Sequence, residues 1–239
     1  SNYKQDNPFS NAFGKASVEV LKEFTPDEIA QISVEELAEF IQSHGKNRFA
    51  NSEEIASALK QAARRAYRLN SKMQQVCEIA LSLTLQNIEH LKRQIKSLDK
   101  VISRELKAIP QTLTTVKGLG EVSAAGIIAE IGDIKPFKNE ASLAQYAGLT
   151  WTRYQSGDFD AEERRLTKSG NKYLRYYLVM AANSLRVHNE EYKAYYPTKY
   201  QEVQKHQHKR ALVLTARKLV RLVFALLSKG QIYKGTVRS

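Results

Sequence analysis

A heptad pattern of apolar residues runs through the first half of this 239-residue chain and restricts its possible folds more than any other feature. From Ile55 to Leu83 the apolar residues are spaced alternately four and three apart, and after a slip at Ile88 the pattern continues to Leu106. This spacing predicts a coiled-coil seam on a helix, with cations such as Arg64 off the seam. If unbroken, the helix is about 80 Å long at ~1.5 Å per residue.

An isolated helix of this kind would expose its apolar stripe, so the seam needs a partner. We favour pairing with a second copy of the chain, which gives a homo-oligomer, either a dimer or a tetramer. The alternative is an intrachain hairpin that folds back near Leu83–Ile88. Cys77, the single cysteine, lies within the apolar pattern, and we expect it to be a core residue of a protein in a reducing compartment.

Three capping motifs precede and open this pattern. "TPDE", "SVEE" and "NSEE" each place a capping residue three positions before a glutamate, the capping residues being Thr25, Ser33 and Asn51. Such boxes satisfy the unpaired amides at a helix start, so helices should begin near residues 26, 34 and 52. His44-Gly45 has the composition of the end of the second helix.

The order of these signals predicts an all-α chain in three parts. A helical N-terminal segment covers 1–51, a coiled coil covers 52–108, and Pro110 marks the start of a compact domain over 109–239. Glycines punctuate this last part between helical stretches. A minor β element is expected near Ser156, where β-favouring residues flank a turn.

Positive charge is concentrated at the end of the chain. The formal net charge is +12, and residues 164–239 hold 17 Lys and Arg against three Asp and Glu. Segregated charge of this kind predicts a polyanionic partner, which means nucleic acid, although a solvated basic surface is the alternative. No apolar run reaches the ~18 residues of a membrane span and no secretory signal pattern is visible, so we expect no membrane contact and a cytoplasmic location.

The segment "TVKGLGEVSAAGIIAEIG" resembles a helix-hairpin-helix motif. Gly118 and Gly120 would permit backbone conformations that a side chain forbids, and the amides that follow would face a phosphate. Lys117 adds charge to the turn. Such a motif holds the DNA backbone without reading bases, whereas a tight helical hairpin with no ligand is the alternative.

The segment "YQSGDFDAEERRLTKSGNKYLR" contains two further turns. Its first half predicts an irregular hairpin with Ser156 near the bend, and its second half places Gly170 and Asn171 at a helix N-terminus suited to an anion. From the residues alone, Ser156 is better explained by an ordinary turn, because Ser-Gly-Asp is a common turn sequence. The cations around these turns are Arg164, Arg165, Lys168, Lys172 and Arg175.

Taken together, these segments resemble the transposases of the insertion-sequence 110 family. The segments are "TVKGLGEVSAAGIIAEIGDIKPFKN", "ASLAQYAGLT", "YQSG", "LTKSGNKYLR" and "ARKLVRLVFALLSKGQIY", and the resemblance extends from the first residues to about Tyr233. Members of the family carry a RuvC-type nuclease domain, a coiled coil and a C-terminal transposase domain. The resemblance implies site-specific DNA recombination directed by a guide RNA, which pairs with target and donor DNA.

The resemblance also implies a serine nucleophile in the serine–glycine turn that follows Ala-Gly-Leu-Thr, which is Ser156 in this chain. Its hydroxyl would attack a DNA phosphorus and form a covalent phosphoserine link. Arg175 and Lys172 would stabilise the developing charge, with the other cations of the segment as further candidates.

Two features depart from the family pattern. Trp151 occupies the position that is usually a proline after Gly-Leu-Thr. The four carboxylates of the nuclease domain are absent, so the Mg²⁺ expected there has no ligands in this chain, and no other cofactor is expected. We therefore expect this fragment to be inactive in recombination when alone.

Three other interpretations stay open at this point. The chain could be a non-catalytic DNA- or RNA-binding module that dimerises through its coiled coil, or an interaction protein with no affinity for nucleic acid. Seven of the twelve tyrosines lie between Tyr173 and Tyr200, which allows a tyrosine nucleophile assisted by Arg175 and His188. We expect Tyr173, Tyr176 and Tyr177 instead to supply bulk for helix packing. His206 and His208 have no third ligand nearby, so no metal site is expected.

Overall fold

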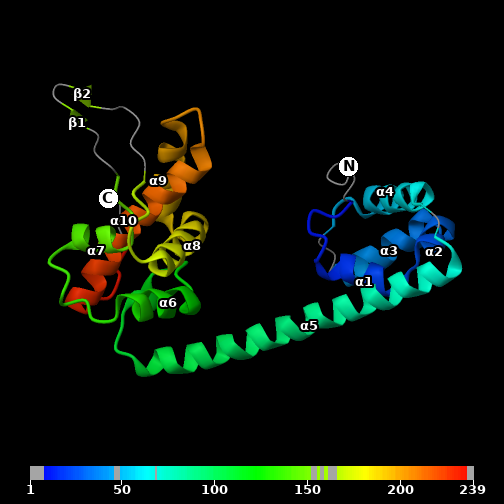
Figure 1. The fold of residues 1–239 in the computed structure, drawn as a ribbon, viewed down its shortest axis with the longest axis horizontal. Coiled ribbons are helices and arrows are strands. Elements are labelled where there is room, and N and C mark those ends of the chain that lie inside the picture. Colours follow the sequence, from blue (N-terminus) through cyan, green and yellow to red (C-terminus); the bar gives the residue numbers. More distant parts are fainter. Residues whose placement is uncertain are drawn as a thin grey trace. The chain divides into compact units, whose positions relative to one another are not determined.

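A computed structural model describes residues 8–45, 49–67, 69–151, 155–156, 159–160 and 166–235. The chain divides into two units, Ser1–Gln94 and Ile95–Ser239, and each described part has its own hydrophobic core (Figure 1). Nearly all of the described regular structure is α-helical. The exceptions are one 3₁₀ turn and a pair of two-residue strands, which confirms the predicted all-α fold with a minor β element.

Four short helices form the core of the N-terminal unit. Leu37 and Ile41 are fully buried at its centre, and aromatic rings such as Phe40 pack around them. The third helix packs against the first and the fourth, which also contacts the second. The bounds of these helices are α1 Lys15–Glu23, α2 Pro26–Gln31, α3 Val34–His44 and α4 Ser52–Arg65.

The predicted helix starts at 26, 34 and 52 are confirmed. Thr25 forms the full capping box with Glu28, and the Ser33 hydroxyl accepts the amide of Glu36 at 3.0 Å. The box predicted at Asn51 is wrong, because its side chain accepts no helix amide and instead donates to the Glu54 carboxylate at 2.9 Å. The second of these helices ends at His44-Gly45, as predicted.

The predicted coiled-coil seam is divided between two helices. Its first part lies in α4, whose Ala56 and Ala63 are buried in the core of the N-terminal unit. Ala66, which follows α4, has an extended backbone conformation, and the next helix, α5, begins at Ser71. The Asn70 side chain accepts the amide of Met73 at the start of α5. The prediction of a single helix over 52–108 is therefore wrong, because the first apolar residues of the pattern pack in the core of the N-terminal unit.

Helix α5, Ser71–Ala108, runs without interruption through the region where a fold-back was the alternative, so the intrachain hairpin near Leu83–Ile88 is wrong. Leu85 and Leu106 are buried, but many other apolar residues of α5 are exposed. Cys77 is exposed as well, which corrects the prediction of a core thiol. The exposed apolar residues of α5 include Met73, Val76, Ile79, Leu83, Leu91, Ile95 and Leu98.

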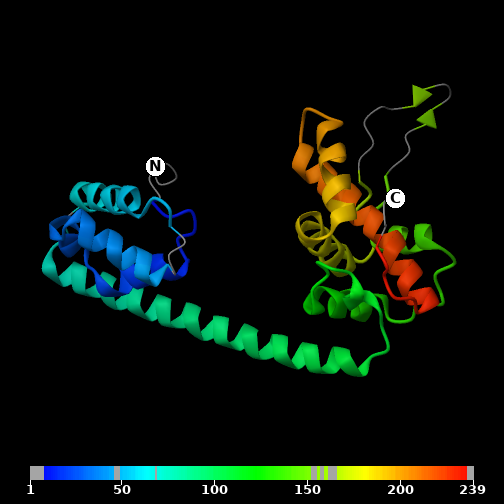
Figure 2. The same ribbon diagram turned by 180° about the vertical axis from the view of Figure 1, so that it is seen from behind.

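The C-terminal unit is built around α8. Its residues Leu174, Leu178 and Leu185 are fully buried, and it packs against α6, α9 and α10, as Figures 1 and 2 show from opposite sides. Helix α7 packs on α10. The bounds are η1 Leu113–Thr115, α6 Glu121–Ile131, α7 Glu140–Tyr146, α8 Lys172–His188, α9 Glu190–Gln201 and α10 Gln207–Lys229.

The most apolar run of the chain lies in α10, where Leu219, Val220 and Val223 are fully buried in this core. The run is therefore a core helix. None of the helices that the structure describes is both long enough and apolar enough to cross a membrane.

Strands β1, Gln155–Ser156, and β2, Phe159–Asp160, form one antiparallel pair. Gln155 is opposite Asp160 and Ser156 is opposite Phe159, so only residues 157 and 158 separate the last paired positions. This register confirms the predicted hairpin with Ser156 next to its bend.

Candidate nucleic-acid interface

The N-terminus of α8 is held by Asn171. Its Oδ1 accepts the amides of Tyr173 at 2.9 Å and Leu174 at 3.0 Å, while its Nδ2 donates to the Glu130 carboxylate at 2.8 Å. The predicted helix start is therefore confirmed. Because Asn171 already occupies two of the first amides, an anion at this end would be held chiefly by side chains rather than by helix amides.

The turn before α8 fits tightly under the end of α7. Gly170 has φ of +113°, and a β-carbon there would collide with the carbonyl oxygen of Tyr146 and stand 3.0 Å from that of Gln145. The amide of Asn171 donates to the same Tyr146 oxygen at 2.6 Å. Only glycine satisfies both the backbone conformation and this close approach. The turn also holds Lys168, which is exposed and has φ of 53°.

The two predicted charge-stabilising residues are in different environments. Arg175 is half-buried, and its Nη1 donates to the carbonyl oxygen of Ala147 at 3.0 Å, across the positive-φ Gly148. Lys172 is exposed, with Nζ 4.9 Å from the centre of the Tyr173 ring. Arg175 thus joins α8 to the end of α7, and Lys172 is the more accessible cation.

Described residues that precede β1 and follow β2 in the chain are paired with each other. Trp151 forms an antiparallel bridge with Leu166, and the hydroxyls of Thr150 and Thr167 lie 3.0 Å apart. Because Thr167 directly precedes Lys168, these two pairs, which we call the base of the hairpin, adjoin the turn at the start of α8. The side chain of Ser156 lies outside the described residues, as do Arg164 and Arg165.

The helix-hairpin-helix-like turn lies at the other end of α8. A β-carbon on Gly118 would be 3.0 Å from the Cβ of His188, and Asn189 Nδ2 donates to the Lys117 carbonyl at 3.3 Å. Gly118 has φ of +94°, as the motif requires, but Gly120 has an ordinary φ of −69° as the N-cap of α6. Conformational freedom therefore explains the first glycine and not the second. Lys117 is exposed.

The predicted site residues whose side chains the structure describes fall into two groups. Lys168, Gly170, Asn171, Lys172 and Arg175 lie at the start of α8, whereas the Lys117–Gly120 turn lies beside its end. A helix of 17 residues separates the groups by about 25 Å. A nucleic acid that contacts both groups has to run along this distance.

A cleft on α10 adds cations that sequence reasoning did not include in the site. Its volume is about 750 Å³, and cations of α10 line it. Burial lowers the pKa of the Arg217 guanidinium, the charge of Arg221 lowers it further, and Glu140 opposes the shift. The lining residues are Thr150, Trp151, Tyr195, Leu214, Arg217, Lys218 and Arg221.

The tyrosines of α8 have different roles. The Tyr177 ring packs over Gly126 of α6 so closely that a β-carbon there would be 2.5 Å from it, which confirms the expected packing role. Tyr173 and Tyr176 are each 57% exposed, so the same expectation is wrong for them. Tyr192 on α9 is buried, and burial raises the pKa of its hydroxyl.

Within the described residues, no group of three or more His, Cys, Asp or Glu side chains could hold a metal ion. His208 instead lies 2.6 Å from the Tyr196 hydroxyl. The Mg²⁺ implied by the resemblance does not fit this donor set, so the chemistry proposed for the chain involves its own side chains only.

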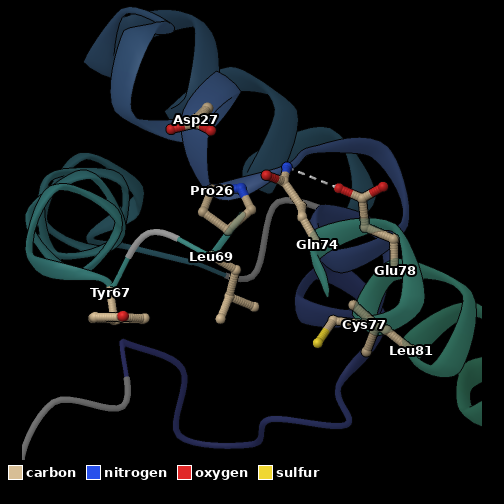
Figure 3. A pocket seen from close by; sticks show the side chains of 8 residues that line it. All are labelled: Pro26, Asp27, Tyr67, Leu69, Gln74, Cys77, Glu78 and Leu81. Carbon is tan, nitrogen blue, oxygen red and sulfur yellow. Dashed lines mark hydrogen bonds between the residues drawn. The ribbon is translucent and has the colours of Figure 1, made fainter. Parts of the chain in front are cut away.

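The N-terminal unit contains a separate hollow of about 170 Å³. Figure 3 shows that Pro26 of α2, Cys77 of α5 and residues of the α4–α5 connection surround it, and that Gln74 Nε2 donates to Glu78 Oε1 at 3.0 Å. The lining is mainly apolar.

Part of the C-terminal unit is similar to a known family. Residues 110–197 match the model of the transposase IS116/IS110/IS902 family. Over these residues the chain is similar to transposases of the IS110 type, in agreement with the resemblance predicted from the sequence.

Individual relatives agree with this assignment. An uncharacterized 43.6 kDa protein of insertion element IS110 from Streptomyces coelicolor is 29% identical over 143 residues, covering 59% of this chain and 35% of the relative. The pilin gene-inverting protein of Moraxella bovis is 29% identical over 157 residues, covering 63% of this chain and 48% of the relative. An uncharacterized 44.8 kDa protein of insertion element IS116 from Streptomyces clavuligerus is 24% identical over 238 residues, covering 95% and 56%. The chain thus spans between about a third and just over half of these relatives.

Proposed function

We propose that this chain supplies the strand-joining part of a DNA recombinase and that Ser156 is its nucleophile. The family match supports recombination as the reaction class, and one relative is a gene-inverting protein. The observation that carries the proposal for Ser156 is the strand register. Pairing of Ser156 with Phe159 puts the serine at the end of β1, directly before residues 157 and 158. Functional residues are often found at such positions next to a loop.

The proposed step exchanges one phosphoester for another. The Ser156 Oγ forms a bond to a DNA phosphorus as the bond from that phosphorus to the 3′-oxygen breaks. The serine proton ends on the departing 3′-oxygen, and a 5′-phosphoserine link is left. A 3′-hydroxyl of the partner strand then attacks the same phosphorus and releases the serine, so no phosphoester energy is lost to hydrolysis.

The cations at the start of α8 would stabilise the charge that develops on the phosphorus. Lys172 and Lys168 are exposed beside the base of the hairpin, and Arg175 is oriented by Ala147. Positioned cations favour the transition state because they need no reorganisation as charge develops. Arg164 and Arg165, which precede Leu166 in the chain, are further candidates.

Nucleic-acid contacts at the other end of α8 would position the substrate. We infer that Lys117 and the Gly118–Gly120 turn hold a phosphate backbone, although Glu121 at the first position of α6 limits the charge available there. A guide RNA, paired with target and donor DNA, would supply sequence choice. The protein itself would then recognise only the phosphate backbone and the shape of the nucleic acid.

Covalent trapping separates this proposal from the binding-module alternative. A suicide DNA substrate with sulfur in place of the bridging 3′-oxygen supplies a better leaving group. If the chain acts as a recombinase once it is joined to a RuvC-type nuclease domain, that longer protein should form a covalent protein–DNA band that resists denaturant. A module that only binds nucleic acid should form a complex that dissociates in denaturant, and this result would remove the enzymatic interpretation.

We also propose that a second copy of the chain covers the exposed stripe of α5. Ile95 is 58% exposed, although its spacing from Leu91 and Leu98 follows the heptad seam. A parallel or antiparallel pair of α5 helices would bury these side chains and bring two transposase domains into one assembly. The exposed apolar run on a single helix is the observation that favours a homo-oligomer.

Ile95→Asp is expected to weaken self-association about a hundredfold, because a carboxylate would be buried in the seam. Analytical ultracentrifugation over a concentration series measures the change. Ser97→Asp adds the same charge to an exposed position off the seam and should leave association nearly unchanged. A chain that is monomeric at tens of micromolar, or equal effects of the two variants, would contradict the proposed pairing.

A further inference from the structure

We propose that the cleft formed by α9, α10 and the Thr150–Trp151 segment binds one unpaired nucleotide of a nucleic-acid strand. Arg217 and Arg221 would hold its phosphate, and its base would lie against Trp151 or Tyr195. This inference deepens the proposed function and rests on it, because the site would hold a strand beside the base of the hairpin that carries Ser156.

The positive charge of Arg217 and Arg221 in the cleft favours binding of an anion. Within the described part of the chain, Arg217 Nη1 is a buried nitrogen with no hydrogen-bond partner. A buried guanidinium nitrogen that is left without an acceptor is costly, and Arg221, one helical turn further on, adds a second positive charge. Burial and Arg221 both lower the pKa of the Arg217 guanidinium. A phosphate oxygen would supply the missing acceptor and relieve the repulsion.

Lys218 forms an ion pair and a cation–π contact within the protein. Its Nζ is 2.8 Å from the Glu191 carboxylate and 4.6 Å from the centre of the Tyr195 ring. Glu191 offsets its charge, and the cation–π contact fixes the face of Tyr195 in the cleft. The net positive charge that an incoming phosphate meets therefore comes from Arg217 and Arg221.

The shape of the cleft fits a nucleotide better than an inorganic anion. Its volume of about 750 Å³ is within the range of sites that hold a small organic ligand. Two aromatic side chains, Trp151 and Tyr195, come from different elements and line it together with the cations. Aromatic rings combined with cations are typical of sites for unpaired bases, because a paired base keeps both faces stacked in the duplex.

The location links the cleft to the proposed chemistry. Trp151 bridges to Leu166, and Thr150 to Thr167, at the base of the hairpin. A nucleic-acid strand with one nucleotide bound against Trp151 would therefore lie next to the protein segment that leads to Ser156. The shared chemistry, a phosphodiester with an unpaired base, occurs in both single-stranded DNA and the guide RNA.

Trp151 is the only tryptophan of the chain, so its fluorescence reports on this cleft alone. The chain carrying Ser156→Ala is titrated with oligothymidylate and with oligouridylate of equal length. We expect saturable quenching, and we expect Arg217→Gln combined with Arg221→Gln to weaken binding at least about tenfold. The slope of log affinity against log salt should become shallower by about 0.7 for each phosphate that the variant no longer binds.

Lys209→Gln combined with Lys229→Gln is the matched control, since it removes two exposed charges from the same helix. Arg221→Gln alone provides a second test if the double variant does not fold, because its side chain is exposed and its loss should still weaken binding about threefold. A larger loss of affinity for thymidylate identifies a DNA strand, a larger loss for uridylate identifies the guide RNA, and equal losses identify a site for either strand.

Absent quenching, or equal weakening by the two double variants, would overturn the proposal. The assay needs no reaction at phosphorus. Its failure is therefore distinguishable from a failure of covalent trapping, which would refute the nucleophile and leave the cleft in place.

Discussion

Replacing Ser156 with alanine is expected to lower the yield of covalent protein–DNA adduct by about a thousandfold or more. The substitution removes the hydroxyl that we propose as the nucleophile, and loss of a nucleophile has effects of about 10³ to 10⁶ in enzymes that form covalent intermediates. DNA affinity should change less than about twofold, because no charge is lost. Adduct formation is measured by denaturing gel with the suicide substrate, and affinity by filter binding.

Ser169→Ala is the matched control for this experiment. It removes a hydroxyl from the exposed turn that precedes α8, next to the same cations, without touching the hairpin. Full adduct yield with Ser169→Ala and none with Ser156→Ala supports the assignment. Retained adduct in the Ser156 variant would mean that another side chain attacks the DNA, and the exposed Tyr173 and Tyr176 would then be the first to replace.

Replacing Gly170 with alanine is expected to lower the free energy of unfolding by about 3–5 kcal/mol. A β-carbon at this position collides with the Tyr146 carbonyl, in a backbone conformation with φ of +113° that side chains rarely adopt. The end of α7 would separate from the start of α8, and the hydrogen bond from the Asn171 amide to Tyr146 would break. Chemical denaturation followed by circular dichroism measures the change.

Gly120→Ala is the control for backbone replacement. Gly120 has φ of −69°, and a β-carbon there meets nothing within 4 Å. As an N-cap substitution it should cost less than about 1 kcal/mol. If both variants lowered the free energy of unfolding equally, the contact between the end of α7 and the start of α8 would contribute less stability than proposed.

Local signals in the sequence predicted much of the fold because they depend on neighbouring residues. Thr25 and Ser33 cap helices through amides two or three residues away, and Asn171 does the same for α8. The break between α4 and α5 could not be predicted in this way. The heptad spacing continues through Ala66, and only the packing of Ala56 and Ala63 in the N-terminal core ends the seam there.

The candidate site could be predicted only in part for a similar reason. The turn at Gly170 and the hairpin at Ser156 are local features, and both were found from composition and spacing. The cleft depends on Trp151 meeting Arg217, which are distant in the chain and come together because the C-terminal unit folds around α8. No spacing rule links two such residues.

The most direct test of the central claim is the chemical identity of the residue that becomes attached to DNA. The chain, joined to a RuvC-type nuclease domain, is incubated with the suicide substrate. The adduct is digested with protease and nuclease, and the modified peptide is sequenced by mass spectrometry. We predict a single nucleotide phosphate on Ser156, in the peptide that contains Gln155 and Phe159. A phosphate on a tyrosine of α8 or on any other residue, or bound DNA with no adduct at all, would contradict the account.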